Sequence, residues 1–123
     1  MKKENRLRKR KQFNWTFKNG KSVYSKDLVL VFTSSKSKDY KVGFSVTKKV
    51  GKAVVRNKIK RRLKNIVTNF QNNIAGKSTM IFVAKPTAIE TDFEELKSQV
   101  VFLLKKANLF KETENIEIEK IES

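Results

Sequence analysis

The sequence of 123 residues contains no cysteine and no histidine, and it has only one proline and four glycines. Without cysteine the chain forms no disulfides and has no thiolate chemistry, which fits a reducing cytosol, so we expect a cytoplasmic protein. Without histidine it has no imidazole to act as a general base or a metal ligand. Together these absences exclude a conventional zinc site.

Long apolar runs are also missing. No stretch approaches the roughly 20 apolar residues that cross a bilayer. The first residues, MKKENRLRKRKQF, have no apolar segment after their charges, so they do not resemble a secretory signal. A protein that binds an anionic membrane surface is therefore a weak alternative.

Acidic residues are scarce and unevenly placed. The chain has 29 Lys and Arg against 12 Asp and Glu, a formal net charge of +17. Residues 1–89 hold 24 of the bases and three of the acids, whereas residues 90–123 hold five bases and nine acids. A field of this sign attracts polyanions. Nucleic acid is therefore the expected partner.

The order of apolar and polar residues predicts one α+β domain. We expect helices at 9–20, 54–73 and from Thr91 onward, and strands at 27–35, 40–49 and 78–86, with a possible short extra strand near 22–24. The predicted architecture is an α/β sandwich in the order α-β-β-(β)-α-β-α. Residues 1–11 are expected to form a solvated basic arm, 12–110 the domain, and 111–123 an acidic, weakly ordered tail.

The first helix carries Phe13 and Phe17 on one face, four residues apart, and either the core or a binding cleft would account for them. Trp15 lies on another face, and its spacing assigns it no role. On strand 40–49, alternation sends Val42, Phe44 and Val46 to a core face. A polar second face suits a shallow groove as well as plain solvent, and its expected residues are Lys41, Gly43, Ser45 and Thr47, joined by Val29, Val31 and Thr33.

The central helix has a buried stripe with a band of positive charge beside it. The stripe consists of Ile59, Leu63, Ile66, Val67, Phe70 and Ile74. The band consists of Asn57, Lys60, Arg61 and Lys64, with Arg56 at its boundary. Asn57 is a mediocre helix former, but its amide both donates and accepts hydrogen bonds, which suits a 2′-hydroxyl or a base edge. A purely solvated basic helix is the alternative.

No arrangement of residues predicts catalysis by the chain alone. The stretch GKA at 51–53 is not a phosphate-binding P-loop, because Val46 stands where the first glycine belongs and Ala53 replaces Ser or Thr. The acids Asp92, Glu94 and Glu95 follow one another at a helix start, where Thr91 and Glu94 have capping-box spacing. We therefore read this cluster as helix capping and not as a metal site.

The stretch KKVGKAVVRNKIKRRLK (48–64) closely resembles the signature helix of the bacterial ribonuclease P protein subunit, whose pattern is A-V-x-R-N-x-x-K-R-x-x-R. Weaker matches are the basic start, F-x-x-x-F at 13–17, VGFSVTKK at 42–49 and AKP at 84–86, so the resemblance covers roughly residues 3–110. It departs from the family at Lys64, which replaces an arginine fork by a point charge. It also departs at Val31, where relatives can carry a tyrosine able to stack on a base.

The resemblance implies a ribosomal-protein-like α/β sandwich with a left-handed βαβ crossover around helix 54–73. It implies an endoribonuclease that works as a ribonucleoprotein: the RNA partner holds the active site and Mg²⁺, and the complex cuts the 5′ leader from precursor tRNA. No catalytic residue and no protein-bound metal are expected in this chain. The implied RNA-binding residues are Lys49, Lys52, Arg56, Asn57, Lys60, Arg61 and Lys64. The implied 5′-leader cleft is lined by Phe13, Phe17, Val31, Ser45 and Thr47, and the basic arm contributes Arg6, Arg8, Lys9 and Arg10.

A structural RNA binder such as a ribosomal protein shares this size and charge, and it is the main alternative function. RNA retained during purification would separate the two.

Overall fold

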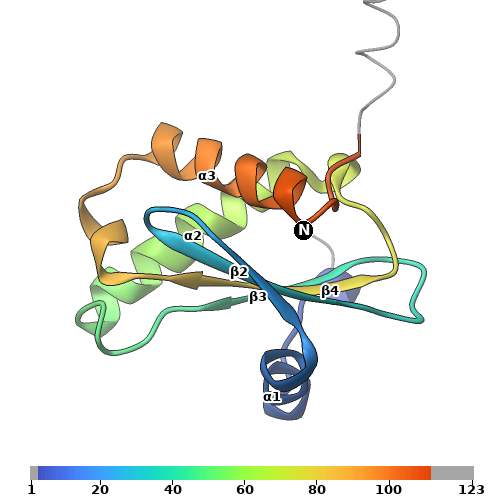
Figure 1. The fold of residues 1–123 in the computed structure, drawn as a ribbon. Helices are drawn as coiled ribbons and strands as arrows, with labels where there is room; N and C mark the ends of the chain where they lie inside the picture. Colours follow the sequence, from blue (N-terminus) through green and yellow to red (C-terminus); the bar gives the residue numbers. More distant parts are fainter. Residues whose placement is uncertain (1–2, 112–123) are drawn as a thin grey trace, which may run out of the picture.

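A four-stranded sheet carries helices on both of its faces in the computed structural model, which describes residues 3–111 (Figure 1). The helices are α1 (Arg10–Asn19), α2 (Ala53–Asn69) and α3 (Phe93–Lys106). The strands are β1 (Lys21–Tyr24), β2 (Leu28–Ser34), β3 (Lys41–Ser45) and β4 (Ser78–Ala84). This order confirms the predicted α+β fold and its optional short strand. The predicted acidic tail lies outside the described residues, apart from Lys111.

Most predicted elements are slightly longer than the observed ones, and two of them extend four residues past the observed ends. Strand β3 stops at Ser45, because Val46 and Thr47 leave the sheet before the turn at 48–50. Helix α2 stops at Asn69 and is followed by a 3-10 turn at Gln71–Asn73 instead of continuing as one helix. The predicted stripe holds for Ile59, Leu63, Ile66, Val67 and Ile74, which are all buried, whereas Phe70 is half-buried against the core.

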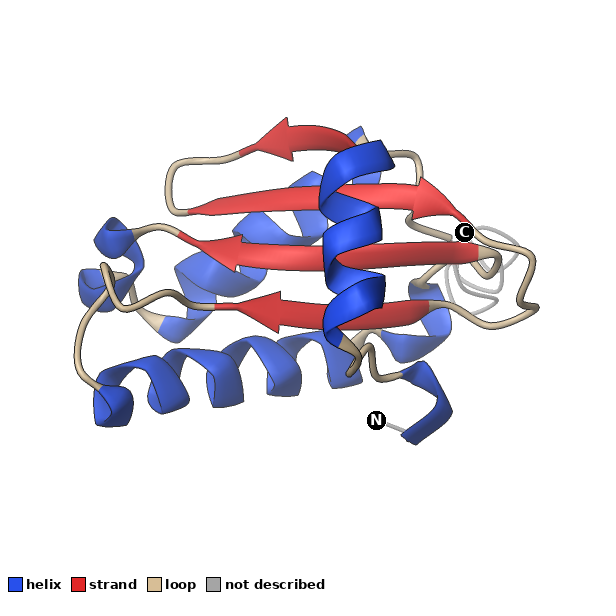
Figure 2. Cartoon of the chain, turned by 90° about the horizontal axis from the view of Figure 1, so that it is seen from below, coloured by secondary structure: helices blue, strands red, loops and turns tan. Residues whose placement is uncertain are grey.

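The strands lie in the order β1-β2-β4-β3, so β3 is an edge strand. Strands β1, β2 and β4 pair antiparallel, whereas β3 and β4 pair parallel and are joined through α2. Figure 2 views the sheet from the side that α1 crosses, with α2 on the far side. Followed from β3 through α2 to β4, the crossover is left-handed, as the family resemblance implies and against the strong general preference for right-handed connections.

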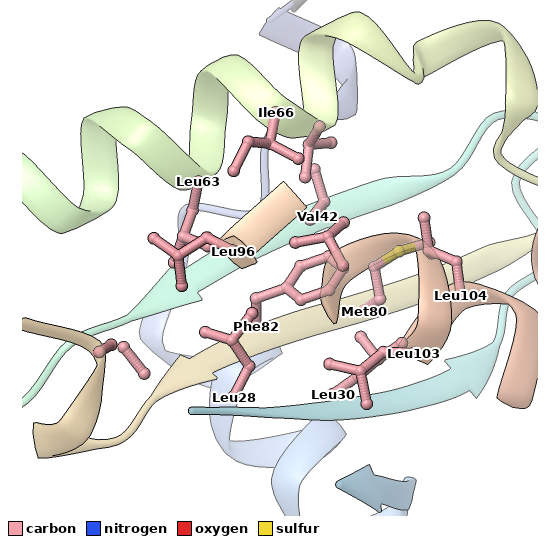
Figure 3. Packing of buried hydrophobic residues seen from close by; sticks show 14 of the residues in the cluster. Leu28, Leu30, Val42, Leu63, Ile66, Met80, Phe82, Leu96, Leu103 and Leu104 are labelled. Carbon is pink, nitrogen blue, oxygen red and sulfur yellow. The ribbon is translucent and has the colours of Figure 1, made fainter. Parts of the chain in front are cut away.

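One face of the sheet forms the core with α2 and α3. The strands send alternate apolar side chains to this face, as a period of two residues requires. They include Leu28, Leu30, Val42, Met80 and Phe82, which are completely or almost completely buried. Figure 3 shows Phe82 among Leu63 of α2, Leu96 of α3 and the side chains of the neighbouring strands. This single apolar layer provides most of the burial that stabilises the domain.

The other face is crossed by α1 alone (Figure 2). Val31 of β2 and Gly43 of β3 are both paired with Ile81 of β4, so these three residues form one row across the sheet. A methyl group at Gly43 would lie 2.5 Å from Cζ of Phe13, which means that the ring of Phe13 rests directly on the backbone of β3. Helix α1 therefore crosses the sheet over this row, and only glycine permits so close an approach.

The N-terminal segment is docked and not solvated throughout. The backbone N–H of Leu7 donates to the carbonyl of Val42 at 2.9 Å, and Arg6 forms a parallel bridge with the same residue. Asn5 is buried, and its Nδ2 donates to the carbonyl of Tyr40 at 2.7 Å. The prediction of a solvated arm is therefore wrong for Asn5 and Leu7. Pairing with the open edge of β3 compensates for the conformational entropy that this segment loses when it is ordered. Arg8, Lys9 and Arg10 are exposed, as predicted.

The start of α3 is capped by Asp92 and not by Thr91. The Asp92 carboxylate accepts from the backbone N–H of Glu95 at 2.8 Å. The hydroxyl of Thr91 instead donates to Oδ2 of the buried Asp27 at 2.7 Å, and Nε2 of Gln99 donates to the same oxygen at 2.7 Å. The capping-box prediction was wrong in its residue, because a long-range partner competes for the Thr91 hydroxyl.

Candidate nucleic-acid interface

The basic band of α2 gathers several cations on one side of the helix. Lys60 and Arg61 are exposed, and Arg56 and Lys64 are half-buried beside the apolar stripe that anchors the helix. No acidic residue occurs in the sequence between Asp39 and Glu90, so the band has no acid within its own part of the chain. A continuous row of cations on a rigid helix is suited to follow a phosphate backbone.

Arg56 differs from the other cations of the band. Its Nε is buried and makes no hydrogen bond within residues 3–111. A buried donor without a partner costs about 1–3 kcal/mol. An anionic acceptor from outside the chain, such as a phosphate oxygen, would remove this cost, because the guanidinium group donates several parallel hydrogen bonds.

The remaining predicted RNA-binding residues surround the start of α2. Lys52 is the N-cap residue of the helix, with no side-chain cap, and no acid lies in the first turn. Lys49 lies in the preceding turn, and Asn57 is at the start of the second turn of α2; both side chains are exposed. The N-terminal end of a helix carries free N–H groups and partial positive charge, which adds to the attraction for anions.

A groove of about 350 Å³ joins the basic band to α1 at the edge of β3. Phe13 of α1 forms part of one wall, and Lys60, Arg61 and Lys64 of α2 form part of another. Arg6 and Leu7, from the docked N-terminal segment, complete the lining together with residues 42–44 of β3. Gly43 belongs to the strand face that was expected to suit a groove. Leu7 was not expected here, since its place depends on how the N-terminal segment lies on β3.

The predicted leader cleft lies along α1 and is partly open. Phe13 is half-buried and Phe17 is 44% exposed, with their ring centroids 6.5 Å apart. Phe17 is therefore not a core residue, and Phe13 is one only in part. Ser45 is half-buried at the end of β3, and Thr47 is exposed beyond it. Two residues of the same row as Ser45, Val29 and Val83, are also half-buried on this face.

Val31 does not lie on the open part of this face. It is only 6% exposed, and its Cγ1 lies 3.1 Å from where a methyl group at Gly20 would stand, just past the end of α1. Its place in the sheet row beneath α1 explains the burial. The prediction that Val31 lines the cleft is corrected accordingly: it supports α1 from below.

The described residues show no sign of a metal centre or of a membrane-spanning helix. Residues 3–111 contain no group of three or more carboxylate, histidine or cysteine side chains placed to hold a metal ion. Within the same residues, no helix has both the length and the apolar character needed to cross a bilayer.

Comparison with known proteins shows the family of this chain. The family model described as Ribonuclease P matches residues 1–108. This chain belongs to the ribonuclease P protein family. Its relatives include the ribonuclease P protein components of Clostridium botulinum (strain 657 / Type Ba4), 37% identical over 88% of this chain and 98% of the relative, and of Bacillus velezensis, 37% identical over 92% and 97%.

Solved structures of the family have the same fold. The RNase P protein of Staphylococcus aureus superimposes with a TM-score of 0.81 at 29% identity, over 87% of this chain and 98% of that one. The protein from Thermotoga maritima gives a TM-score of 0.76 at 28% identity, over 82% and 96%. Membership of this family implies a role in tRNA processing within a ribonucleoprotein, and therefore an RNA partner.

Proposed function

We propose that this chain binds the catalytic RNA of ribonuclease P through the basic band of α2. We further propose that it binds the 5′ leader of precursor tRNA through the cleft beside α1. The observation that carries the proposal is the groove at the β3 edge, which brings Phe13 and the three cations Lys60, Arg61 and Lys64 to one place. Single-stranded RNA is bound by this combination, because bases stack on aromatic rings while cations neutralise phosphates.

The chemistry of leader removal is assigned to the RNA. The reaction is an Mg²⁺-dependent hydrolysis, and we place the Mg²⁺ ions mainly on RNA phosphates, because the protein's band offers cations where a metal would need oxygen ligands. The cations of the band reduce the repulsion between phosphates that must approach one another in the folded RNA. The protein should therefore matter most when Mg²⁺ is scarce.

Reconstitution tests this proposal directly. The purified chain should leave precursor tRNA intact, and it should speed the cleavage by cognate ribonuclease P RNA at low Mg²⁺. Arg56→Ala or Arg61→Ala should impair assembly or activity under these conditions. Cleavage by the protein alone, or an RNA-driven rate that does not respond to it, would contradict the proposal.

Two lysines of α2 provide a matched control. Lys60 and Lys58 are both exposed, but only Lys60 lines the groove. Lys60→Ala should weaken RNA binding more than Lys58→Ala, although each variant loses one charge. If about six phosphates are neutralised, the affinity of the unmodified protein should fall on the order of a thousandfold between 50 and 200 mM salt. Equal effects of the two variants would indicate a diffuse field and not a defined band.

A further inference from the structure

The face crossed by α1 has a second groove, on the opposite side of the helix from Phe17. Its volume is about 270 Å³. Lys11, Gln12 and Trp15 of α1 form one wall, and Ser35, Lys41 and Thr79 at the near ends of the strands contribute to the rest. The sheet register explains why the two grooves are separate. Gly43 and Ile81 form the row beneath α1, Lys41 and Thr79 form the row on the side of the second groove, and Ser45 and Val83 form the row on the other side.

Trp15 is not needed to hold α1 on the sheet. Its side chain is 55% exposed, whereas Thr16 is buried and Phe13 rests on Gly43. A single exposed aromatic residue needs no explanation by itself. Here, however, the indole stands at a groove whose other side chains are polar or cationic except for Leu7, so the site combines a flat stacking surface with hydrogen-bonding groups.

The charges around this groove select an anion. Lys11 and Lys41 line it from α1 and from β3, and no acidic residue is among its lining residues. Asp39, which is close in sequence to Lys41, lines a different pocket with Asn5 and Tyr40. A ligand with an aromatic ring and a negative charge close to it matches this arrangement, and an unpaired nucleotide has both.

We propose that this groove binds one unpaired nucleotide of RNA, with its base stacked on Trp15 and the neighbouring phosphates near Lys11 and Lys41. The inference rests on the proposed function, because it takes the chain to be an RNA-binding protein. It adds a contact outside the leader cleft and outside the basic band of α2. The nucleotide belongs either to the RNA of the ribonucleoprotein or to its substrate, and the same chemistry serves both.

Trp15 reports on this site directly, because it is the only tryptophan in the chain. A short single-stranded oligoadenylate added to the full-length protein should quench or shift its fluorescence, since stacking places the base against the indole. Polyphosphate of similar charge should leave the emission unchanged. The proposal is overturned if oligoadenylate binds, as judged by anisotropy of a labelled strand, while the Trp15 emission stays constant. It is equally overturned if polyphosphate has the same effect as oligoadenylate.

Variants separate stacking from charge. Trp15→Leu should weaken binding of the labelled oligoadenylate about tenfold, and Trp15→Phe should restore part of that loss, because it keeps an aromatic face. Lys11→Ala should weaken binding more than Lys18→Ala, since both lie on α1 but only Lys11 lines the groove. Far-UV circular dichroism checks that each variant is folded. Equal affinity of Trp15→Leu and the unmodified protein would contradict the proposal.

Adding ribonuclease P RNA first and precursor tRNA second identifies which RNA supplies the nucleotide. If it comes from the ribonuclease P RNA, the emission of Trp15 should change when that RNA is added. If it comes from the substrate, the change should occur only after precursor tRNA is added. If the protein activates the RNA normally but the Trp15 emission changes at neither step, the nucleotide site at Trp15 is contradicted and the proposed function is not. If the protein fails to activate the RNA but still responds to oligoadenylate, the proposed function is contradicted and the nucleotide site is not.

Discussion

The two faces of the sheet differ in how completely helices cover them. On one face, α2 and α3 enclose Leu28, Leu30 and Phe82, which have no exposed surface. On the other face, only the ten residues of α1 cross the strands, and they leave Phe17 and Trp15 exposed on either side. The closed face stabilises the domain, and the open face keeps aromatic and polar groups available for a ligand. Substitutions on the two faces should therefore have different consequences.

The largest loss of stability is expected on the closed face. Phe82→Ala removes a fully buried ring from the centre of the core and should lower the free energy of unfolding by about 3–5 kcal/mol. Urea denaturation followed by circular dichroism measures this. A loss below about 1 kcal/mol would mean that the two faces contribute similarly, because removal of an exposed aromatic residue costs little.

Gly43→Ala tests the contact between α1 and β3. Its methyl group would overlap the ring of Phe13, so either α1 or the strand must shift, at a cost of about 1–3 kcal/mol. The shift should also weaken binding of leader-containing RNA, measured by comparing precursor and mature tRNA. Adding Phe13→Leu removes the clashing end of the ring and should recover stability. No recovery in the double variant would show that the overlap is not the cause.

Asp27 gives the closed side a dependence on pH. Burial alone would raise the pKa of its carboxyl, but hydrogen bonds from Gln99, Thr87 and Thr91 outweigh burial and lower the pKa below its ordinary value of 3.8. A lowered pKa in the folded state stabilises the fold above the ordinary value and loses that effect as pH falls through the folded-state pKa.

Asp27→Asn should therefore lower the free energy of unfolding by about 1 kcal/mol near neutral pH. The difference between the variant and the unmodified protein should shrink at acid pH. Urea denaturation at several pH values measures it. A difference that is constant with pH would show that the ionised form is not what the hydrogen bonds stabilise.

The smallest change in stability is expected at Phe17. Because its side chain is exposed and outside the core, Phe17→Ala should change the free energy of unfolding by no more than about 0.5 kcal/mol. It should nevertheless weaken binding of leader-containing precursor tRNA about tenfold while leaving the affinity for mature tRNA similar. Equal losses for both RNAs would assign Phe17 to packing and not to the leader cleft.

Most secondary structure could be predicted from the sequence, because side-chain periodicity is a local property. The stripe of α2 and the alternation of β3 each follow from spacing within one element. Helix capping by the acids at the start of α3 was predicted correctly, but the choice of Thr91 as the cap residue was wrong, because its hydroxyl donates to Asp27, 64 residues away in the sequence. The burial of Asn5 and Leu7 could not be predicted either, since only pairing with the edge of β3 makes burial of that segment favourable.

The sequence by itself determined the order of the elements, the lateral band of charge on α2 and the family to which the chain belongs. Those properties depend on residues that are close together along the chain. Only the tertiary structure decided that Val31 lies under α1, that Phe13 meets the basic band in one groove and that Trp15 stands at a second groove. The physical reason is that the register of β2, β4 and β3 places distant residues in common rows. Helix α1 lies over one of these rows and so divides one face of the sheet into two surfaces.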